Sequence, residues 1–412
     1  MTNSPVDTVA ATTRRSILLL SFATFSSMCA QRICDAMLPE LARVFAVSLG
    51  QAAHVVSVFA ITYGVAQLVY GPLGDRLGKY RIVTFCAFSC SAGSLVAVLA
   101  SSLDMLLVAR FLMSLSAAGL IPLSMAWVGD SVPTDRLQEM LTRTGLGSTL
   151  GLVAGQLLGG LLTDAFGWRW CFVFLAVLFT VVGTFLLNDL RRQRVAVVDV
   201  SGGLINAAHA IGPVQRINFI RQAILIITGP WSRLVLLMAA VEGAVSFGVL
   251  AIWASHLHHR FGLSLTTAGA IVALFGLGGM LYMLVARTLI ARFGQQRLVI
   301  AGGALFGVCA CVIAFASNWP VAMPASLISG FGFFMFHNTM QATATSMAPL
   351  ARGTAVSLFS SFLFLGQSVG VVLAAILIER IGSSAVISGA GVVMALEGLF
   401  FAWMLKRRAA AG

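Results

Sequence analysis

Charged residues are scarce in this sequence. Only 10% of the 412 residues are Asp, Glu, Lys or Arg, and acidic residues are the fewest, with 14 against 26 basic ones. An ordinary soluble globular protein has about 25% charged residues, so this shortage excludes that class. The net charge of +12 would suggest a nucleic-acid partner in a soluble protein, so the positions of the basic residues must be examined.

Motifs of enzyme chemistry are also missing. The sequence contains no glycine-rich phosphate loop, no nucleophile paired with a base and no zinc-ligand spacing. The seven cysteines lie in or at the edge of apolar segments, so they indicate neither a disulfide framework nor a redox compartment. His256, His258 and His259 offer metal ligands, but a solvated loop explains them better. The sequence therefore predicts no enzyme activity, no cofactor and no metal site.

Long apolar runs are abundant. Hydrophobic residues make up 59% of the chain, and the mean hydropathy is +0.96. A membrane-spanning helix needs roughly 20 apolar residues. We interpret the first run as a retained span, because it exceeds the apolar core of a secretion signal and lacks a cleavage pattern. The sequence predicts an all-α membrane protein with twelve spans, at residues 16–38, 54–73, 82–102, 105–128, 141–162, 170–188, 232–255, 265–286, 298–317, 320–342, 353–377 and 383–405.

The basic residues lie almost entirely on one side of the predicted membrane. If the N-terminus is inside, the outer side holds only Arg43, Arg169, Arg260 and Arg380. An excess of Lys and Arg marks the cytoplasmic side of a membrane protein, and tryptophans concentrate at both ends of its spans, as they do here. We therefore expect both termini in the cytoplasm and no nucleic-acid partner.

A polar interruption from Asn188 to Trp231 divides the twelve spans into six and six, which predicts two pseudo-symmetric six-helix bundles. Within it, Val214–Thr228 has a helical amphipathic pattern that suits the inner leaflet, although a solvated linker explains it equally well. The predicted regions are a cytoplasmic tail at 1–15, an N-terminal bundle at 16–188, a cytoplasmic loop at 189–231, a C-terminal bundle at 232–405 and a cytoplasmic tail at 406–412.

A charged turn follows the second span. Charges this dense cannot lie in hydrocarbon, so the turn must face water at the inner membrane edge. There Asp75 can face the positive N-terminus of a neighbouring helix while Arg76 pairs with Asp130, which would form a conformational latch; a static topology anchor is the alternative. The candidate latch residues are Gly71, Asp75, Arg76, Gly78, Lys79 and Asp130.

The fifth span carries glycines four residues apart, which line one face of a helix. Such a face lets a neighbouring backbone approach closely and slide, although ordinary tight packing produces the same pattern. The residues of this face and its borders are Gly147, Gly151, Gly155, Gln156, Gly159 and Gly160.

Glu242 lies ten residues into the seventh span, about 15 Å along a helix and hence near the middle of the membrane. An ionisable side chain there costs at least ~2.5 kcal/mol on insertion scales, so it marks a functional site. No basic residue neighbours it in its own helix, which predicts a proton carrier; a protonated Glu hydrogen-bonded between helices is the alternative. We interpret His337, near the inner end of span 10, as a packing residue rather than a proton relay.

Arg32 and Asp35 are three residues apart in the first span and would share a helix face, while Arg110 enters the fourth span at a similar depth. Together they predict a small charge cluster. Asp35 would exchange partners between the two arginines or release a proton when substrate displaces it. A static ion pair explains the pattern nearly as well.

These motifs resemble the major facilitator superfamily over nearly the whole chain. The turn Gly71–Lys79 resembles its signature between spans 2 and 3, and Arg110–Ser114 resembles its second signature, with Met113 and Ser114 where Gln and Gly are usual. Asp35–Pro39 resembles the drug-exporter branch. The span 5 glycines resemble the signature of antiporters, with Gln156 in place of the expected proline.

The resemblance implies a twelve-helix transporter whose two bundles rock around a central site. We expect proton-driven export of small amphipathic molecules by a monomer in the bacterial inner membrane, with substrate, protons and the lipid bilayer as its partners. A proton-coupled permease for a sugar, amino acid or other metabolite is the alternative, and a non-transporting membrane sensor is a third class. Because no ATP-binding motif is found, concentrative transport would draw on an ion gradient.

Overall fold

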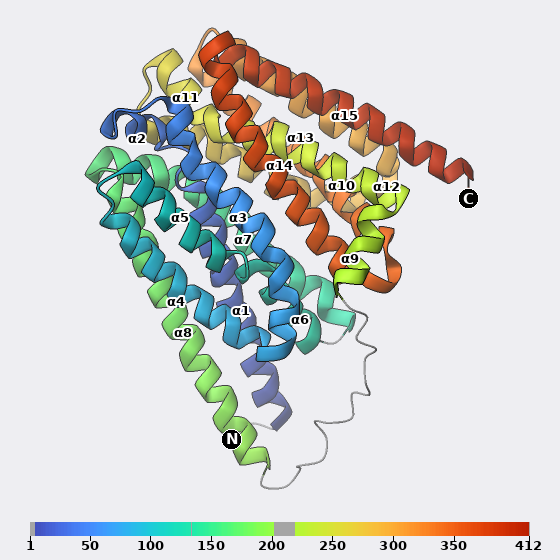
Figure 1. The fold of residues 1–412 in the computed structure, drawn as a ribbon. Helices are drawn as coiled ribbons and strands as arrows, with labels where there is room; N and C mark the ends of the chain where they lie inside the picture. The colour runs from blue at the N-terminus through green and yellow to red at the C-terminus, as the bar shows by residue number, and fades with distance from the viewer. Residues whose placement is uncertain (1–4, 133, 202–218, 412) are drawn as a thin grey trace.

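The computed structural model describes residues 5–132, 134–201 and 219–411, and every regular element in these ranges is a helix (Figure 1). The first half of the chain forms α1 (Pro5–Arg32), α2 (Leu38–Val44), α3 (Leu49–Leu77), α4 (Lys79–Val98), α5 (Leu103–Ala117), α6 (Leu120–Ser131), α7 (Thr134–Phe166) and α8 (Arg169–Ser201).

The second half forms α9 (Phe219–Thr228), α10 (Pro230–Gly243), a π-helical turn (Ala244–Gly248), α11 (Val249–Phe261), α12 (Leu265–Phe315), α13 (Ala322–Met347), α14 (Arg352–Ile381) and α15 (Ser383–Ala411), with short 3-10 turns at Trp319–Val321 and Pro349–Ala351.

Ten helical segments of the described chain are long and apolar enough to cross a membrane, where the sequence predicts twelve spans. The difference has two causes. α12 contains two predicted spans. They form one continuous run of helical turns with a kink at Gly294, whose φ is 71°. α1 covers the first predicted span, but Arg14, Arg15 and Arg32 lower its mean hydropathy. The all-α membrane fold is confirmed, and the chain is an integral membrane protein.

Two predicted spans are broken inside the membrane. Span 4 consists of α5 and α6, which meet at Ala118 and Gly119. A Cβ atom on Gly119 would lie 2.7 Å from the ring of Tyr70, so only glycine lets α3 pack this closely. Span 7 consists of α10 and α11 with the π-helical turn between them, and single π turns inside α-helices are frequent at functional sites.

Local sequence signals set several helix starts. Ser48 begins α3 with a capping box, in which its hydroxyl accepts from the backbone N–H of Gln51 and the Gln51 side chain accepts from the backbone N–H of Ser48. The hydroxyls of Ser102 and Ser264 cap α5 and α12 in the simpler way. These caps satisfy N–H groups that a helix leaves unpaired where the chain enters the membrane.

The predicted amphipathic segment of the central loop is helical where it is described. α9 covers Phe219–Thr228, whereas Val214–Asn218 lies outside the described residues. Ile220, Ile224 and Leu225 on this short helix are exposed. Its placement on the inner leaflet stays a prediction.

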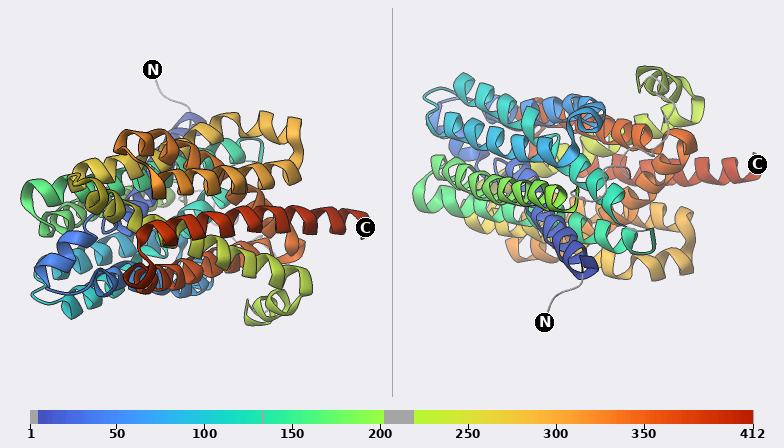
Figure 2. Two further views of the ribbon diagram at one scale, coloured as in Figure 1. Left: turned by 90° about the horizontal axis from the view of Figure 1, so that it is seen from above. Right: turned by 90° about the horizontal axis from the view of Figure 1, so that it is seen from below.

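Two apolar cores fill the molecule. One is built almost wholly from residues 17–190 and the other from residues 226–401, with few crossing members such as Ala36 and Phe364. The halves pack together mainly through α3 against α14 and α7 against α12. Figures 1 and 2 show the C-terminal end of α15 projecting away from the N-terminal end of α1. The exact bundle boundaries stay a prediction.

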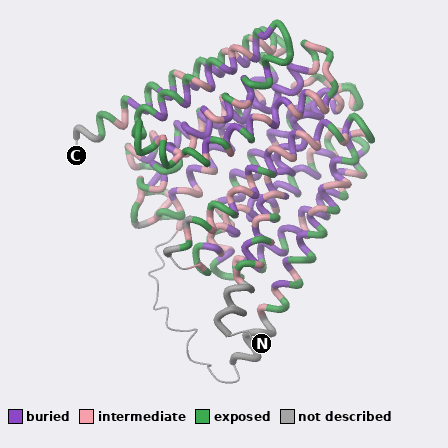
Figure 3. The backbone as a smooth tube through the Cα atoms, turned by 180° about the vertical axis from the view of Figure 1, so that it is seen from behind, coloured by how far each residue is buried: buried purple, intermediate pink, exposed green. Residues whose placement is uncertain are grey.

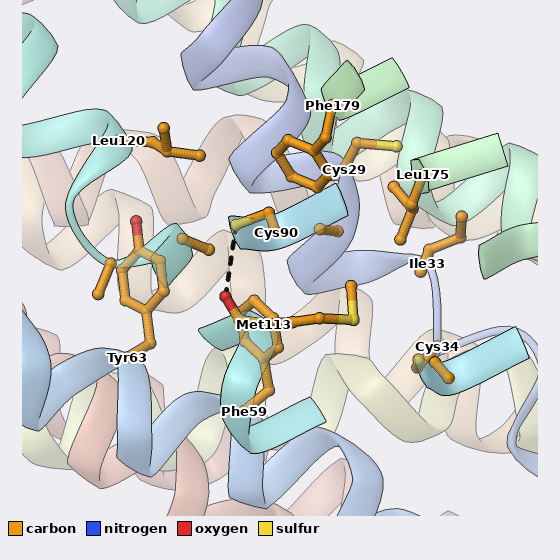
Figure 4. Packing of buried hydrophobic residues seen from close by; sticks show 14 of the residues in the cluster. Cys29, Ile33, Cys34, Phe59, Tyr63, Cys90, Met113, Leu120, Leu175 and Phe179 are labelled. Carbon is orange, nitrogen blue, oxygen red and sulfur yellow. Dashed lines mark hydrogen bonds between the residues drawn. The ribbon is translucent and has the colours of Figure 1, made fainter. Parts of the chain in front are cut away.

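The cysteines act as small core residues. Cys29, Cys34 and Cys90 lie among Phe59, Phe179 and other apolar side chains where α1, α3, α4, α5 and α8 meet (Figure 4). The Cys90 thiol donates to the carbonyl of Met113 across 3.5 Å. All seven cysteines are free thiols in the structure.

Large apolar side chains cover the outside of the helices. Phe85 is 70% exposed and Leu284 82%, and buried backbone is concentrated where helices face one another (Figure 3). Exposed apolar area of this extent is costly in water but matches a hydrocarbon surrounding. This outer surface is therefore the lipid-facing surface.

Candidate functional site

Arg32 and Asp35 form a buried ion pair, with Arg32 Nη1 3.5 Å from Asp35 Oδ2. The prediction that both lie on one helix is wrong, because α1 ends at Arg32 and Asp35 lies in the turn that follows. That turn brings Asp35 against α7, where Gln156 Nε2 donates to the same oxygen across 2.8 Å. This partnership was not predicted from the sequence. Gln156, which stands where the resemblance leads one to expect a proline, holds the Asp35 carboxylate.

Arg110 is fully buried on α5 beside this pair. Its guanidinium donates to the carbonyl of Ala30 across 2.8 Å and to that of Val55 across 3.2 Å, and it lies 4.0 Å from the centre of the Phe59 ring. Backbone acceptors therefore hold Arg110, whereas Asp35 pairs with Arg32. The second half reaches the cluster as well, since the Phe247 ring of the π-helical turn lies 4.2 Å from the Arg32 guanidinium carbon.

Glu242 is fully buried near the end of α10. The sequence placed no partner beside it, but the structure supplies one from α13: His337 Nδ1 lies 2.7 Å from Glu242 Oε1. The other carboxyl oxygen, Oε2, has no hydrogen-bond partner. His337 stacks on the ring of Phe333 with 5.3 Å between ring centres, so it packs as expected and also holds the carboxyl.

The charged turn forms a different network from the one predicted. Lys79 Nζ donates to Asp130 and lies 3.2 Å from Asp75 Oδ1, so Lys79 takes the place that we expected for Arg76. Gly78 has φ of 91°, which separates α3 from α4 and sets Lys79 at the start of the next helix. The network borders an open pocket that includes Arg76, Trp127 and Leu190.

Two glycines of the turn differ in surroundings. A Cβ atom on Gly71 would meet nothing within 4 Å, whereas one on Gly74 would lie 2.5 Å from the Leu123 side chain. Close packing of α3 on α6 therefore depends on Gly74, which the sequence analysis missed. Gly71 is not required for close packing in this conformation.

The glycine face of α7 packs directly on the backbone of α1. Cβ atoms on Gly147, Gly151, Gly155 and Gly159 would lie between 2.2 and 2.7 Å from carbonyl oxygens of that helix and the turn after it. Gly160 points elsewhere, because its Cβ would lie 2.1 Å from the carbonyl oxygen of Leu265 in the second half. The face therefore joins α7 to α1 over about three turns of ~3.6 residues each, and Gly160 borders the interface between the halves.

That interface includes a carboxylate that the sequence analysis missed. Asp164 Oδ2, near the end of α7, accepts from the backbone N–H of Thr266 across 2.7 Å and from its hydroxyl across 2.6 Å. Deeper in, Ser368 donates to the carbonyl of Ser57, and the Tyr63 and Phe364 rings meet edge to face at 4.7 Å. The halves are thus joined at the end of the molecule where α7 ends and α12 begins.

A second missed carboxylate is Glu397, which is buried on α15, a helix that packs against the Glu242 helix α10. Its position in an apolar segment was the signal that could have identified it, as it identified Glu242.

Comparison with known proteins gives consistent results. The family model described as Major Facilitator Superfamily matches residues 20–349 and 234–412. A relative in Bacillus subtilis (strain 168), named uncharacterized MFS-type transporter YceJ, is 24% identical over 348 residues, which cover 83% of this chain and 84% of that protein. The multidrug export protein EmrB of Escherichia coli (strain K12) is 23% identical over 395 residues, covering 84% of this chain and 76% of that protein.

Solved structures share the fold at low sequence identity. A bacterial homolog of the human lysosomal transporter Spinster, solved in an inward-facing and unoccupied conformation, superimposes with a TM-score of 0.73 at 16% identity. The match covers 97% of this chain and 96% of that one.

Proposed function

The chain belongs to the major facilitator superfamily, and on that premise we propose that it exports small amphipathic molecules in exchange for protons. Transport of small molecules across a membrane follows from the family. The observation that carries proton coupling is the fully buried Glu242, bonded to His337 and with a free oxygen. An ionisable residue inside a membrane marks a functional site by default, and proton relays are among the functions of such sites.

In the proposed cycle, protons from outside neutralise Glu242, and Asp35 where it is reached, which disfavours substrate binding and permits return to the inward-open state. Release of the protons inside restores affinity for the cargo. In this cycle the cargo binds the deprotonated state more tightly than the protonated state. The proton gradient drives the change between these two states. The pairing of Asp35 with Arg32 and Gln156 gives that carboxyl partners to exchange.

Export rather than uptake is supported by the α7 glycine face and by the printed name of the EmrB relative. The network of Lys79, Asp75 and Asp130 would form the inner latch that biases the switch between the two arrangements of the halves. We further propose a monomer in the bacterial inner membrane with both termini in the cytoplasm, as the distribution of basic residues predicts.

The experiment uses inside-out membrane vesicles from cells that overproduce the full chain, with ethidium as the fluorescent probe. A growth-inhibition panel with and without overproduction selects further probes. We expect acidification of the vesicle interior to drive accumulation and nigericin to abolish it. Accumulation that survives collapse of the pH difference would refute proton coupling, and probe flux in the opposite direction would favour the permease alternative.

A further inference from the structure

Glu397 is a buried carboxyl with no described side-chain hydrogen-bond partner. Its side chain on α15 is 5% exposed, no described side chain donates to either carboxyl oxygen, and the carboxyl lies within reach of the Glu242 backbone. Burying a carboxyl that no side chain bonds is costly, above all when it is charged. A residue that only packs would be better replaced by an apolar one, so this side chain calls for a function.

The groups that face Glu397 come from several helices. α10 packs against α15 and contributes Glu242, whose backbone the Glu397 carboxyl approaches, and α13 contributes His337 through Glu242. α12 packs along α15, but its nearest basic residue, Arg297, is exposed. The bases of α15 itself begin at Lys406, more than two turns further along, and α14 has charged residues only toward its ends. The π-helical turn has no charge of its own and reaches Arg32 through Phe247.

Glu242 and Glu397 also lie at similar depth. Glu397 is eight residues from the predicted inner end of its span, about 12 Å at ~1.5 Å per residue, and Glu242 is about 15 Å from the inner end of its own. Within the described residues, His337 bonds Glu242, and no guanidinium or ammonium group forms an ion pair with either carboxyl. Two carboxylates sharing such a site cannot both stay ionised without a counter-charge.

We propose that Glu397 is a second proton-binding residue of the transporter and shares the coupling proton with Glu242. The proton enters from the outer water, binds a carboxyl oxygen of the pair and cancels one negative charge. It later leaves to the inner water and restores that charge, with His337 positioning the Glu242 oxygen throughout. This inference rests on the proposed proton coupling, but its central claim concerns proton sharing and is measurable without transport.

The test is pH-difference infrared spectroscopy of the purified full chain in lipid, which detects the carbonyl stretch of protonated carboxylic acids. We expect two coupled steps in the native protein and one in Glu397→Gln. The step that remains should move by at least about one pH unit, because interacting sites titrate as a pair. Glu242→Gln provides the reciprocal measurement and keeps the test decisive if Glu397→Gln does not fold.

Glu379→Gln on α14 is the matched control, since it makes the same chemical change at an exposed position. It should leave both steps in place. Identical titration in the native protein and Glu397→Gln, or a remaining step with an unmoved midpoint, would overturn the proposal, and so would loss of the same step in the control. Sharing observed together with pH-independent vesicle transport would instead refute the proposed function alone.

Discussion

The charge clusters deep in the two halves of the molecule differ in sign. The first-half cluster holds two guanidinium groups, Arg32 and Arg110, with the carboxylate of Asp35; Asp189 is also buried but lies apart on α8, where Ser16 and Tyr80 donate to it. The second-half cluster holds two carboxyls, Glu242 and Glu397, with the imidazole of His337 bonded to Glu242. The two halves have the same arrangement of helices, but their buried clusters differ in charge. This difference indicates that the two clusters have different roles.

The atoms left without partners sharpen the difference. In the first-half cluster they are guanidinium nitrogens of Arg32 and Arg110, together with one oxygen each of Asp35 and Gln156. In the second-half cluster they are carboxyl oxygens of Glu242 and Glu397, which a proton would satisfy directly. Backbone carbonyls, Gln156 and two aromatic rings hold the first cluster in place, whereas the second has one side-chain hydrogen bond, between His337 and Glu242. In the proposed cycle, the second cluster would therefore carry most of the proton exchange and the first would be the more fixed of the two.

The largest effect is expected for Glu242→Gln. Removing the titratable group from the second cluster should reduce pH-driven ethidium accumulation to the level of vesicles without the protein. The amide still accepts a hydrogen bond from His337, so folding and membrane insertion should be retained, as judged by yield and a monodisperse elution profile. Undiminished pH-driven transport would remove Glu242 from the mechanism.

Asp35→Asn should break the first cluster by leaving Arg32 buried without a counter-charge. Removal of one partner from a buried pair typically costs about 3–5 kcal/mol. We expect a clear drop in the thermal unfolding midpoint in detergent, whereas Glu397→Gln, which removes an unpartnered carboxyl, should leave the midpoint unchanged or raise it. Equal destabilisation by Asp35→Asn and Glu397→Gln would contradict this difference between the two clusters.

Gly155→Ala should distort the first cluster from a distance. Its Cβ would lie 2.7 Å from the Cys29 carbonyl oxygen and 3.0 Å from Arg32 Cβ, so α1 would have to move. Overpacking of this kind costs about 1–3 kcal/mol. Gly145→Ala on the same helix is the control, because its Cβ would meet only Met125 at 3.7 Å. If the unfolding midpoint falls equally in both variants, the α7 glycine face has no special role in stability.

Asp75→Asn should have the smallest effect on stability and act on switching. Asp75 is exposed, and exposed ion pairs contribute about 0–1 kcal/mol. With Lys79 still bonded to Asp130, we expect slower ethidium transport with binding retained, measured by initial rates in vesicles and by equilibrium fluorescence titration. Normal turnover would leave the charged turn as a topology signal only.

The fold was predictable because membrane insertion is decided by local sequence. Apolar runs of sufficient length must form helices in lipid, since every backbone polar group has to be satisfied within its own segment. The depth of Glu242, the glycine face of α7 and the water-facing charged turn follow from position along such helices. The prediction failed by a small margin at the end of α1. The helix ends at Arg32, and Asp35 lies in the turn that follows.

The partners within the candidate site were decided by the tertiary structure. Sequence spacing fixes which residues share a helix face, but not how two helices far apart in the chain are rotated and shifted against each other. His337 therefore reached Glu242, Gln156 reached Asp35, and Lys79 took the place expected for Arg76. The amino-acid sequence determined which charges enter the membrane; the packing of the helices determined which of them meet.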